Sequence, residues 1–114
     1  MTQERFKNHI FYHVSDSVQF LKNFKTVCDL IYLDTGDMTP IEPTAQLQIE
    51  EAKAIVQNKL IDRGLVLIDD VKNKTALEQD KNNELGKAKY SIPYLLQHGF
   101  QYVMNEYQVV LARN

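Results

Sequence analysis

Hydrophobic and polar residues follow two different spacings along this chain. Apolar runs rich in β-branched, leucine and aromatic residues occur at 9–14, 27–33 and 65–68, and they predict strands. The run at 65–68 is continuous, which is typical of a strand buried on both faces. Apolar residues recur every three or four positions over 17–24 and 44–62, and this spacing predicts two amphipathic helices. Gly64 is interpreted as the left-handed residue that ends the longer helix.

The last third of the chain begins with a polar stretch, 72–89, that has no periodicity and is long for a connection. Connections of this length are usually functional or disordered. The sequence Ser-Ile-Pro at 91–93 predicts the start of a helix that ends at Gly99. Two further apolar runs, 100–104 and 107–112, are separated by two residues only, which predicts an antiparallel hairpin.

The order strand, helix, strand, helix, strand, helix, hairpin defines the expected fold class. Alternating strands and helices predict an α/β protein with a mostly parallel sheet and right-handed crossovers, and the hairpin adds an antiparallel strand. The 114 residues suit one domain with one core. We therefore expect residues 1–114 to form a single α/β domain.

The net charge and the cysteine content limit the kinds of binding partner and the cellular compartment that we expect for this protein. The net charge is −2 and the basic residues are scattered, so binding to nucleic acid or to an anionic membrane is not expected. No apolar run has membrane-spanning length, and the polar start MTQERFKNH does not resemble a signal peptide. The single cysteine, Cys28, cannot form an internal disulfide, which favours a cytoplasmic location.

Aspartates follow three of the predicted strands: Asp16 the first, Asp34 the second, and Asp69 with Asp70 the third. Ligands of open α/β sheets bind at the carboxyl ends of the strands. Carboxylates gathered there could hold a hard cation such as Mg²⁺, or a ribose, an amine or a substrate hydroxyl. The alternative is that these acids are helix caps and solvated turn residues. The four glycines are isolated from one another, so no glycine-rich phosphate-binding loop is present.

Five segments together resemble a known family: HVSDSVQFL, CDLIYLDTGDM, GLVLIDDV, GKAKYSIPYLLQHGF and EYQVVLAR. They are similar to the second half of class I S-adenosylmethionine-dependent methyltransferases. The nearest kin are small-molecule O-methyltransferases and the group with cephalosporin-hydroxylase-like and macrocin-type enzymes. The resemblance implies a Rossmann-like three-layer sandwich that is truncated at the N-terminus. The family's first strand, its glycine loop and the ribose-binding acid on its second strand have no counterpart here.

The resemblance also implies roles for individual residues. Asp16 and Ser17 match the residues that contact the adenine of the cofactor. Asp34 matches the catalytic acid that ends the family's fourth strand, near the transferred methyl group. In metal-dependent members, that acid and an acidic pair ending the fifth strand hold a divalent cation, and Asp69 and Asp70 match this pair. Catechol-type members have Asp-Asn there, so the pair fits the macrocin-like members better. The 72–89 segment would lie over the substrate.

The resulting functional hypothesis is a methyltransferase that uses S-adenosylmethionine as cofactor and Mg²⁺ or another divalent cation to assist the reaction. The reaction would be O-methyl transfer to a small molecule. Because the cofactor site is incomplete in this chain alone, a homo-oligomer or a complementary chain would have to complete it. One alternative is a non-catalytic remnant of the fold that serves in oligomerisation or partner binding. A third option is a metal-dependent hydrolase that uses the same acids.

Overall fold

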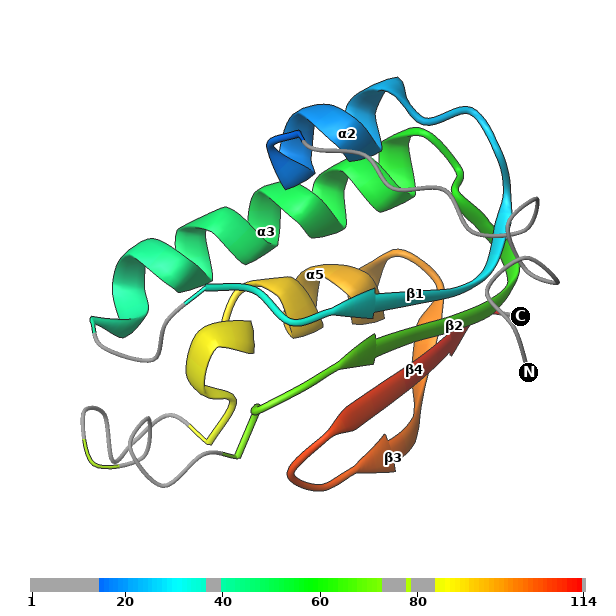
Figure 1. Ribbon diagram of the computed structural model, residues 1–114. Coiled ribbons are helices and arrows are strands. Elements are labelled where there is room, and N and C mark those ends of the chain that lie inside the picture. The colour runs from blue at the N-terminus through cyan, green and yellow to red at the C-terminus, as the bar shows by residue number, and fades with distance from the viewer. Residues whose placement is uncertain (1–14, 37–39, 73–77, 79–83, 114) are drawn as a thin grey trace, which may run out of the picture.

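The computed structural model describes residues 15–36, 40–72, 78 and 84–113 (Figure 1). The predicted strand at 9–14 lies outside these residues, as does most of the predicted loop at 72–89. In chain order the described elements are α2 (Ser17–Asn23), β1 (Cys28–Leu33), α3 (Ile41–Gln57), β2 (Ile61–Ile68), the short 3₁₀ helix η1 (Gly86–Ala88), α5 (Ser91–Gln97), β3 (Phe100–Asn105) and β4 (Val109–Arg113).

The four described strands form one mixed sheet with the order β1-β2-β4-β3. The β1–β2 pair is parallel, and β4 runs antiparallel to both β2 and β3. The predicted α/β class and the C-terminal hairpin are therefore confirmed. The expectation of a mostly parallel sheet is not, because two of the three described strand pairs are antiparallel.

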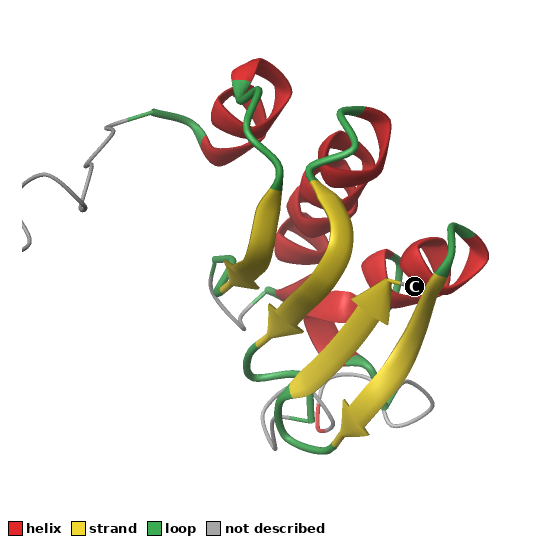
Figure 2. Ribbon diagram, turned by 90° about the vertical axis from the view of Figure 1, so that its right-hand side faces the viewer, coloured by secondary structure: helices red, strands yellow, loops and turns green. Residues whose placement is uncertain are grey.

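The described residues form two layers, with α3 and α5 packed against one face of the sheet (Figure 2). Their shared core contains Ile55 of α3, Ile68 of β2 and Leu95 of α5, each fully buried. On the other face, Leu30 is paired with Leu65 and Tyr32 with Leu67. Leu30 and Tyr32 are 53% and 50% exposed. The third layer implied by the resemblance is therefore not seen in the described part of the chain.

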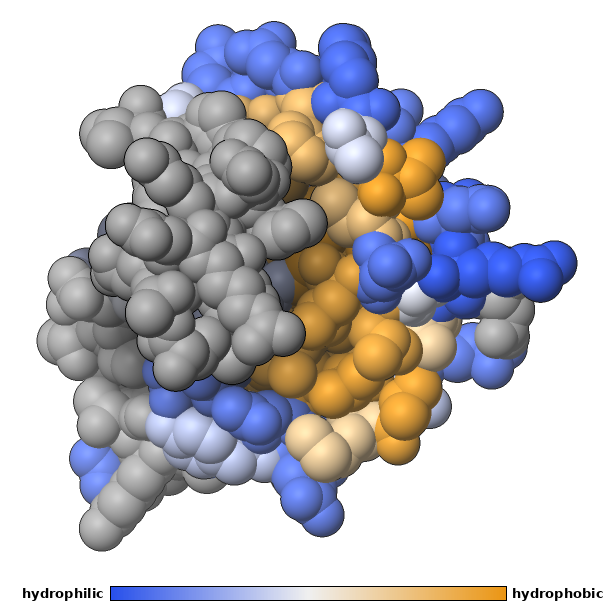
Figure 3. All heavy atoms as spheres, turned by 45° about the vertical axis from the view of Figure 1, so that its right-hand side comes forward, coloured by the Kyte–Doolittle hydropathy of each residue, from blue (hydrophilic) through white to orange (hydrophobic). Residues whose placement is uncertain are grey.

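We call the sheet surface that carries Leu30, Tyr32, Leu65 and Leu67 the open face. Figure 3 shows a group of apolar side chains on one side of the molecule, bordered by polar side chains. Strand β2 was expected to be buried on both faces, but Leu65 is 37% exposed and Leu67 is half-buried. None of the described helices is both long and apolar enough to cross a membrane.

The long helix differs from its prediction at both ends. It begins at Ile41, three residues before the predicted start, because Pro43 falls in the first turn, where a helix does not need the backbone N–H. It ends at Gln57, and Lys59 is the residue with a left-handed backbone, at φ 52°. Gly64 does not end the helix; it lies inside β2, close to the backbone of Asp29.

Candidate metal centre

The ends of β1 and β2 bring three carboxylates together. Leu33 pairs with Ile68 at the last position of both strands, and the Asp69 amide donates to the Leu33 carbonyl at 3.2 Å. One carboxylate oxygen from each of Asp34, Asp69 and Asp70 lies within 4.8 Å of the other two. We call these three side chains the carboxylate cluster.

Tyrosine hydroxyls hold two of the three carboxylates. The Tyr32 hydroxyl donates to Asp69 Oδ2 at 2.5 Å, and Gln108 Nε2 donates to Asp69 Oδ1 at 3.1 Å. The Tyr107 hydroxyl donates to Asp70 Oδ1. The bond from Tyr32 lowers the pKa of Asp69 below its usual value, and the same bond raises the pKa of Tyr32 to about 12. Asp69 is therefore held in its anionic form, the form that a cation needs.

Neither tyrosine was predicted from the sequence to belong to this site. Tyr32 stands two positions before Asp34, and residues two apart along a strand point to the same face. That spacing was a usable signal for Tyr32. Tyr107 reaches Asp70 only because β4 pairs with β2, where Val109 lies opposite Ile68. A contact of that kind depends on the order of the strands, which local sequence does not encode.

A buried lysine that was not predicted from the sequence lies beside the carboxylate cluster. Lys87 belongs to η1 and its side chain has no exposed surface. Its ammonium donates to the Thr35 carbonyl at 3.2 Å and lies 3.5 Å from Asp34 Oδ1. The 72–89 segment, which was expected to lie over a substrate, falls mostly outside the described residues; its residues Gly86–Ala88 are buried and packed against α3. The burial of these three residues left no periodic signal in the sequence.

A layer of buried polar side chains supports the carboxylate cluster from the helical side. The Thr35 hydroxyl donates to Glu51 Oε1, and the Ser91 hydroxyl donates to Gln48 Oε1 at 2.6 Å. Gln48 Nε2 is buried and finds no hydrogen-bond partner among the described residues. These contacts tie the residue after Asp34 and the start of α5 to the same side of α3. The layer consists of Thr35, Thr44, Gln48, Glu51, Lys87 and Ser91.

A second set of contacts fixes the chain just after Lys87. The Lys89 ammonium forms an ion pair with Glu42, and the Tyr90 hydroxyl donates to Glu42 Oε1 at 2.5 Å. The Lys89 contact and then the Tyr90 bond lower the pKa of Glu42 to about 2. Because Glu42 lies in the first turn of α3, the segment that carries Lys87 is fastened to that end of the helix.

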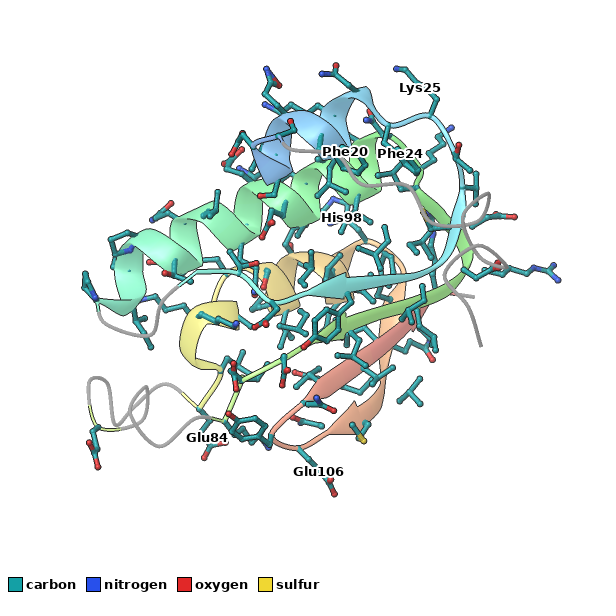
Figure 4. All side chains as sticks on the ribbon, viewed as in Figure 1. Phe20, Phe24, Lys25, Glu84, His98 and Glu106 are labelled. Atoms are coloured by element: carbon teal, nitrogen blue, oxygen red, sulfur yellow. The ribbon has the colours of Figure 1, made fainter. Side chains whose placement is uncertain are left out.

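Asp16 and Ser17 lie apart from the carboxylate cluster, at the start of α2. Asp16 is the N-cap of this helix, and its Oδ2 accepts from the Gln19 amide at 3.2 Å. Ser17 lines a groove of about 550 Å³ between α2 and β1. Phe20 and Phe24, whose rings stack 5.1 Å apart, line the same groove (Figure 4). The groove is thus largely apolar, and the lining residues with a polar side-chain group are Ser15, Ser17, Tyr32 and Glu51.

Comparisons of the chain with protein-family models, with curated protein sequences and with solved structures gave no match. The kind of site is therefore argued from its donor atoms. Three carboxylate oxygens within 4.8 Å of one another are hard, anionic donors, and such donors suit Mg²⁺, Mn²⁺ or Ca²⁺. Three protein ligands leave coordination positions for water or a substrate oxygen. The donor set fits a divalent cation site that is open on one side.

We expect Tyr32→Phe to raise the pKa of Asp69 toward its usual value, because the main donor to the carboxylate is removed. A pKa lowered by folding contributes stability above the unfolded-state pKa, and this stability is lost as pH falls through the lowered value. The variant should therefore lose less stability on acidification than the wild type does. Carboxyl-carbon NMR titration measures the pKa, and Tyr102→Phe on β3 is the control. An unchanged Asp69 titration would contradict the assigned bond.

Proposed function

We propose that this chain is the metal-binding half of a class I S-adenosylmethionine-dependent methyltransferase that methylates a hydroxyl of a small molecule. The observation that carries the proposal is the carboxylate cluster. The three acids that match the family's metal ligands follow two adjacent parallel strands, and their oxygens lie within 4.8 Å of one another. The closing β3–β4 hairpin is a second feature that the resemblance implies.

Each carboxylate has a distinct part in this proposal. Asp69 and Asp70, oriented by Tyr32 and Tyr107, hold the cation from the β2 side. Asp34 holds it from the β1 side, and its side chain is 55% exposed, so it is open to a substrate. A bound cation would orient the substrate hydroxyl and make it more acidic. The proton of that hydroxyl would pass to solvent water as the methyl group is transferred, because Asp34 is already engaged by the cation and by Lys87.

The groove between α2 and β1 is the proposed place for the adenosyl part of the cofactor. Its apolar lining suits the flat face of an adenine, and Ser17 supplies a polar contact at its rim. Within the described sheet, β1 is paired on one side only, by β2. A strand from a complementary chain or a second copy would extend the sheet at β1 and complete the cofactor site.

Calorimetric titration with Mn²⁺ tests the cation site. We expect the wild-type chain to bind Mn²⁺, and we expect Asp34→Asn and Asp69→Asn each to weaken binding at least tenfold, because each removes an anionic ligand. Asp29→Asn is the matched control, since Asp29 is an exposed acid on β1, the strand that Asp34 follows. Equal affinity in all four proteins, or no binding to the wild type, would refute the site.

Titration with S-adenosylhomocysteine, with and without Mg²⁺, tests the cofactor part. Binding of micromolar strength would support a site that is rebuilt across chains. If S-adenosylhomocysteine gives no heat under either condition while Mn²⁺ still binds, the methyltransferase function is refuted. The chain would then be a metal-binding domain without a site for this cofactor.

The second candidate function is a non-catalytic oligomerisation or partner-binding module. The observation that favours it is the open face, with Leu30 at 53% and Tyr32 at 50% exposure. Contiguous exposed apolar surface and unpaired strand edges commonly mark interaction sites. Sedimentation of the purified chain separates the two functions: self-association without cation or cofactor binding would favour the module.

A further inference from the structure

Lys87 is a fully buried lysine whose charge is directed at the carboxylate cluster. Its side chain has no exposed surface, yet its ammonium lies 3.5 Å from an Asp34 carboxylate that is 55% exposed. The same positive charge contributes to lowering the pKa of Asp69. A buried ammonium is costly unless a charge or a strong acceptor compensates it. The cluster and the Thr35 carbonyl supply that compensation.

Groups around the carboxylate cluster offset the repulsion among its three negative charges. Three carboxylates this close repel one another unless positive charge or hydrogen-bond donors lie beside them. Tyr32, Gln108 and Tyr107 supply donors to Asp69 and Asp70. Asp34 is compensated by a positive charge, the ammonium of Lys87.

The ammonium is held firmly in place. The residues on either side of Lys87, Gly86 and Ala88, are buried with it, and η1 packs against α3. Two positions further on, the ion pair between Lys89 and Glu42 anchors the segment to the start of α3. Lys87 cannot leave the cluster without unpacking η1, so a cation that binds there has to do so beside the ammonium.

We propose that Lys87 is the built-in counter-cation of the carboxylate cluster and that its charge weakens the cluster's affinity for a divalent cation. The inference rests on the cation site proposed above and names the residue that limits its affinity. A divalent cation bound through Asp34 would share that carboxylate with the ammonium, and two positive charges on one carboxylate repel each other. Lys87 thus keeps the cluster's affinity for the divalent cation low enough for the bound ion to exchange. Lys87 itself does not coordinate the ion; it acts through its charge beside Asp34.

The test compares Mn²⁺ affinity in the wild type, Lys87→Met and Lys53→Met by calorimetry. Methionine is unbranched and apolar, so it fits the buried path of the lysine stem while removing the charge. Lys53→Met is the control, because it changes the net charge equally at an exposed position on α3. We expect Lys87→Met to bind Mn²⁺ about tenfold or more tightly than the wild type does, and Lys53→Met to bind as the wild type does. If Lys87→Met does not fold, Lys87→Gln replaces it.

A second measurement needs no metal ion. In the presence of a chelator, a double-mutant cycle between Lys87→Met and Asp34→Asn reports the coupling of the two side chains in urea unfolding. We expect Asp34→Asn to cost less stability when Lys87 has already been replaced. Absence of coupling would overturn the counter-cation role.

The outcomes separate the inference from the proposed function. Weaker or unchanged Mn²⁺ binding in Lys87→Met, with normal binding in the wild type, would overturn the inference and leave the cation site intact. No Mn²⁺ binding in either protein would overturn the cation site itself, and the inference with it.

Discussion

Gly64→Ala should lower the free energy of unfolding by about 1–3 kcal/mol, toward the upper end of that range. A Cβ at this position would lie 2.4 Å from the Asp29 carbonyl oxygen and 3.2 Å from its Cα. Both are backbone atoms of β1, so neither can rotate out of the way, and β1 and β2 would have to separate locally. At a position without such a contact, replacing glycine by alanine stabilises a protein by about 0.4–1 kcal/mol through the unfolded state.

The measurement is urea unfolding of the purified chain, with Arg63→Ala as the matched control. Arg63 is the exposed neighbour of Gly64 on β2, so its replacement should change stability by about 0.5 kcal/mol or less. Because Asp34 and Asp69 directly follow β1 and β2, separating the two strands should displace these carboxylates, and we also expect Gly64→Ala to weaken Mn²⁺ binding. A neutral or stabilising effect of Gly64→Ala would show that β1 and β2 do not approach so closely.

Much of the fold could be predicted because burial leaves a periodic trace in the sequence. The run at 27–33 contains β1, the run at 65–68 is the second half of β2, and the spacing at 17–24 matches α2 to within one residue. The hairpin followed from a short link between two apolar runs. The gathering of Asp34 with Asp69 and Asp70 could be predicted for a topological reason: parallel neighbours end at the same edge of a sheet.

The features that could not be predicted depend on contacts between residues that are far apart in the sequence. A glycine suits a left-handed helix end and a close approach of two strands equally well, so the role of Gly64 could not be decided locally. Lys87 lies in a polar stretch without periodicity, and only the packing of η1 against α3 buries it. Asp16, which the resemblance matches to a cofactor contact, is the N-cap of α2, a role that depends only on its place before the helix.

The two faces of β2 provide the second prediction with a large effect. Ile68 points to the helical layer and is fully buried, whereas Leu67 points to the open face and is half-buried. Ile68→Ala should cost about 2–5 kcal/mol, because it removes buried surface and leaves a cavity in the hydrophobic core. Leu67→Ala removes a side chain of the same size from the next position of the strand, and it should cost distinctly less.

Comparison of the two variants at low and high protein concentration turns this prediction into a test of the open face. If the chain is monomeric, the two stability losses stay unequal and independent of concentration. If a second copy covers the open face, the loss for Leu67→Ala grows with concentration, because association stabilises only the wild-type surface. Ile68→Ala should not respond in this way, since its side chain is already covered within the chain. Equal losses at the lowest concentration would mean that the open face is covered by the chain's own residues.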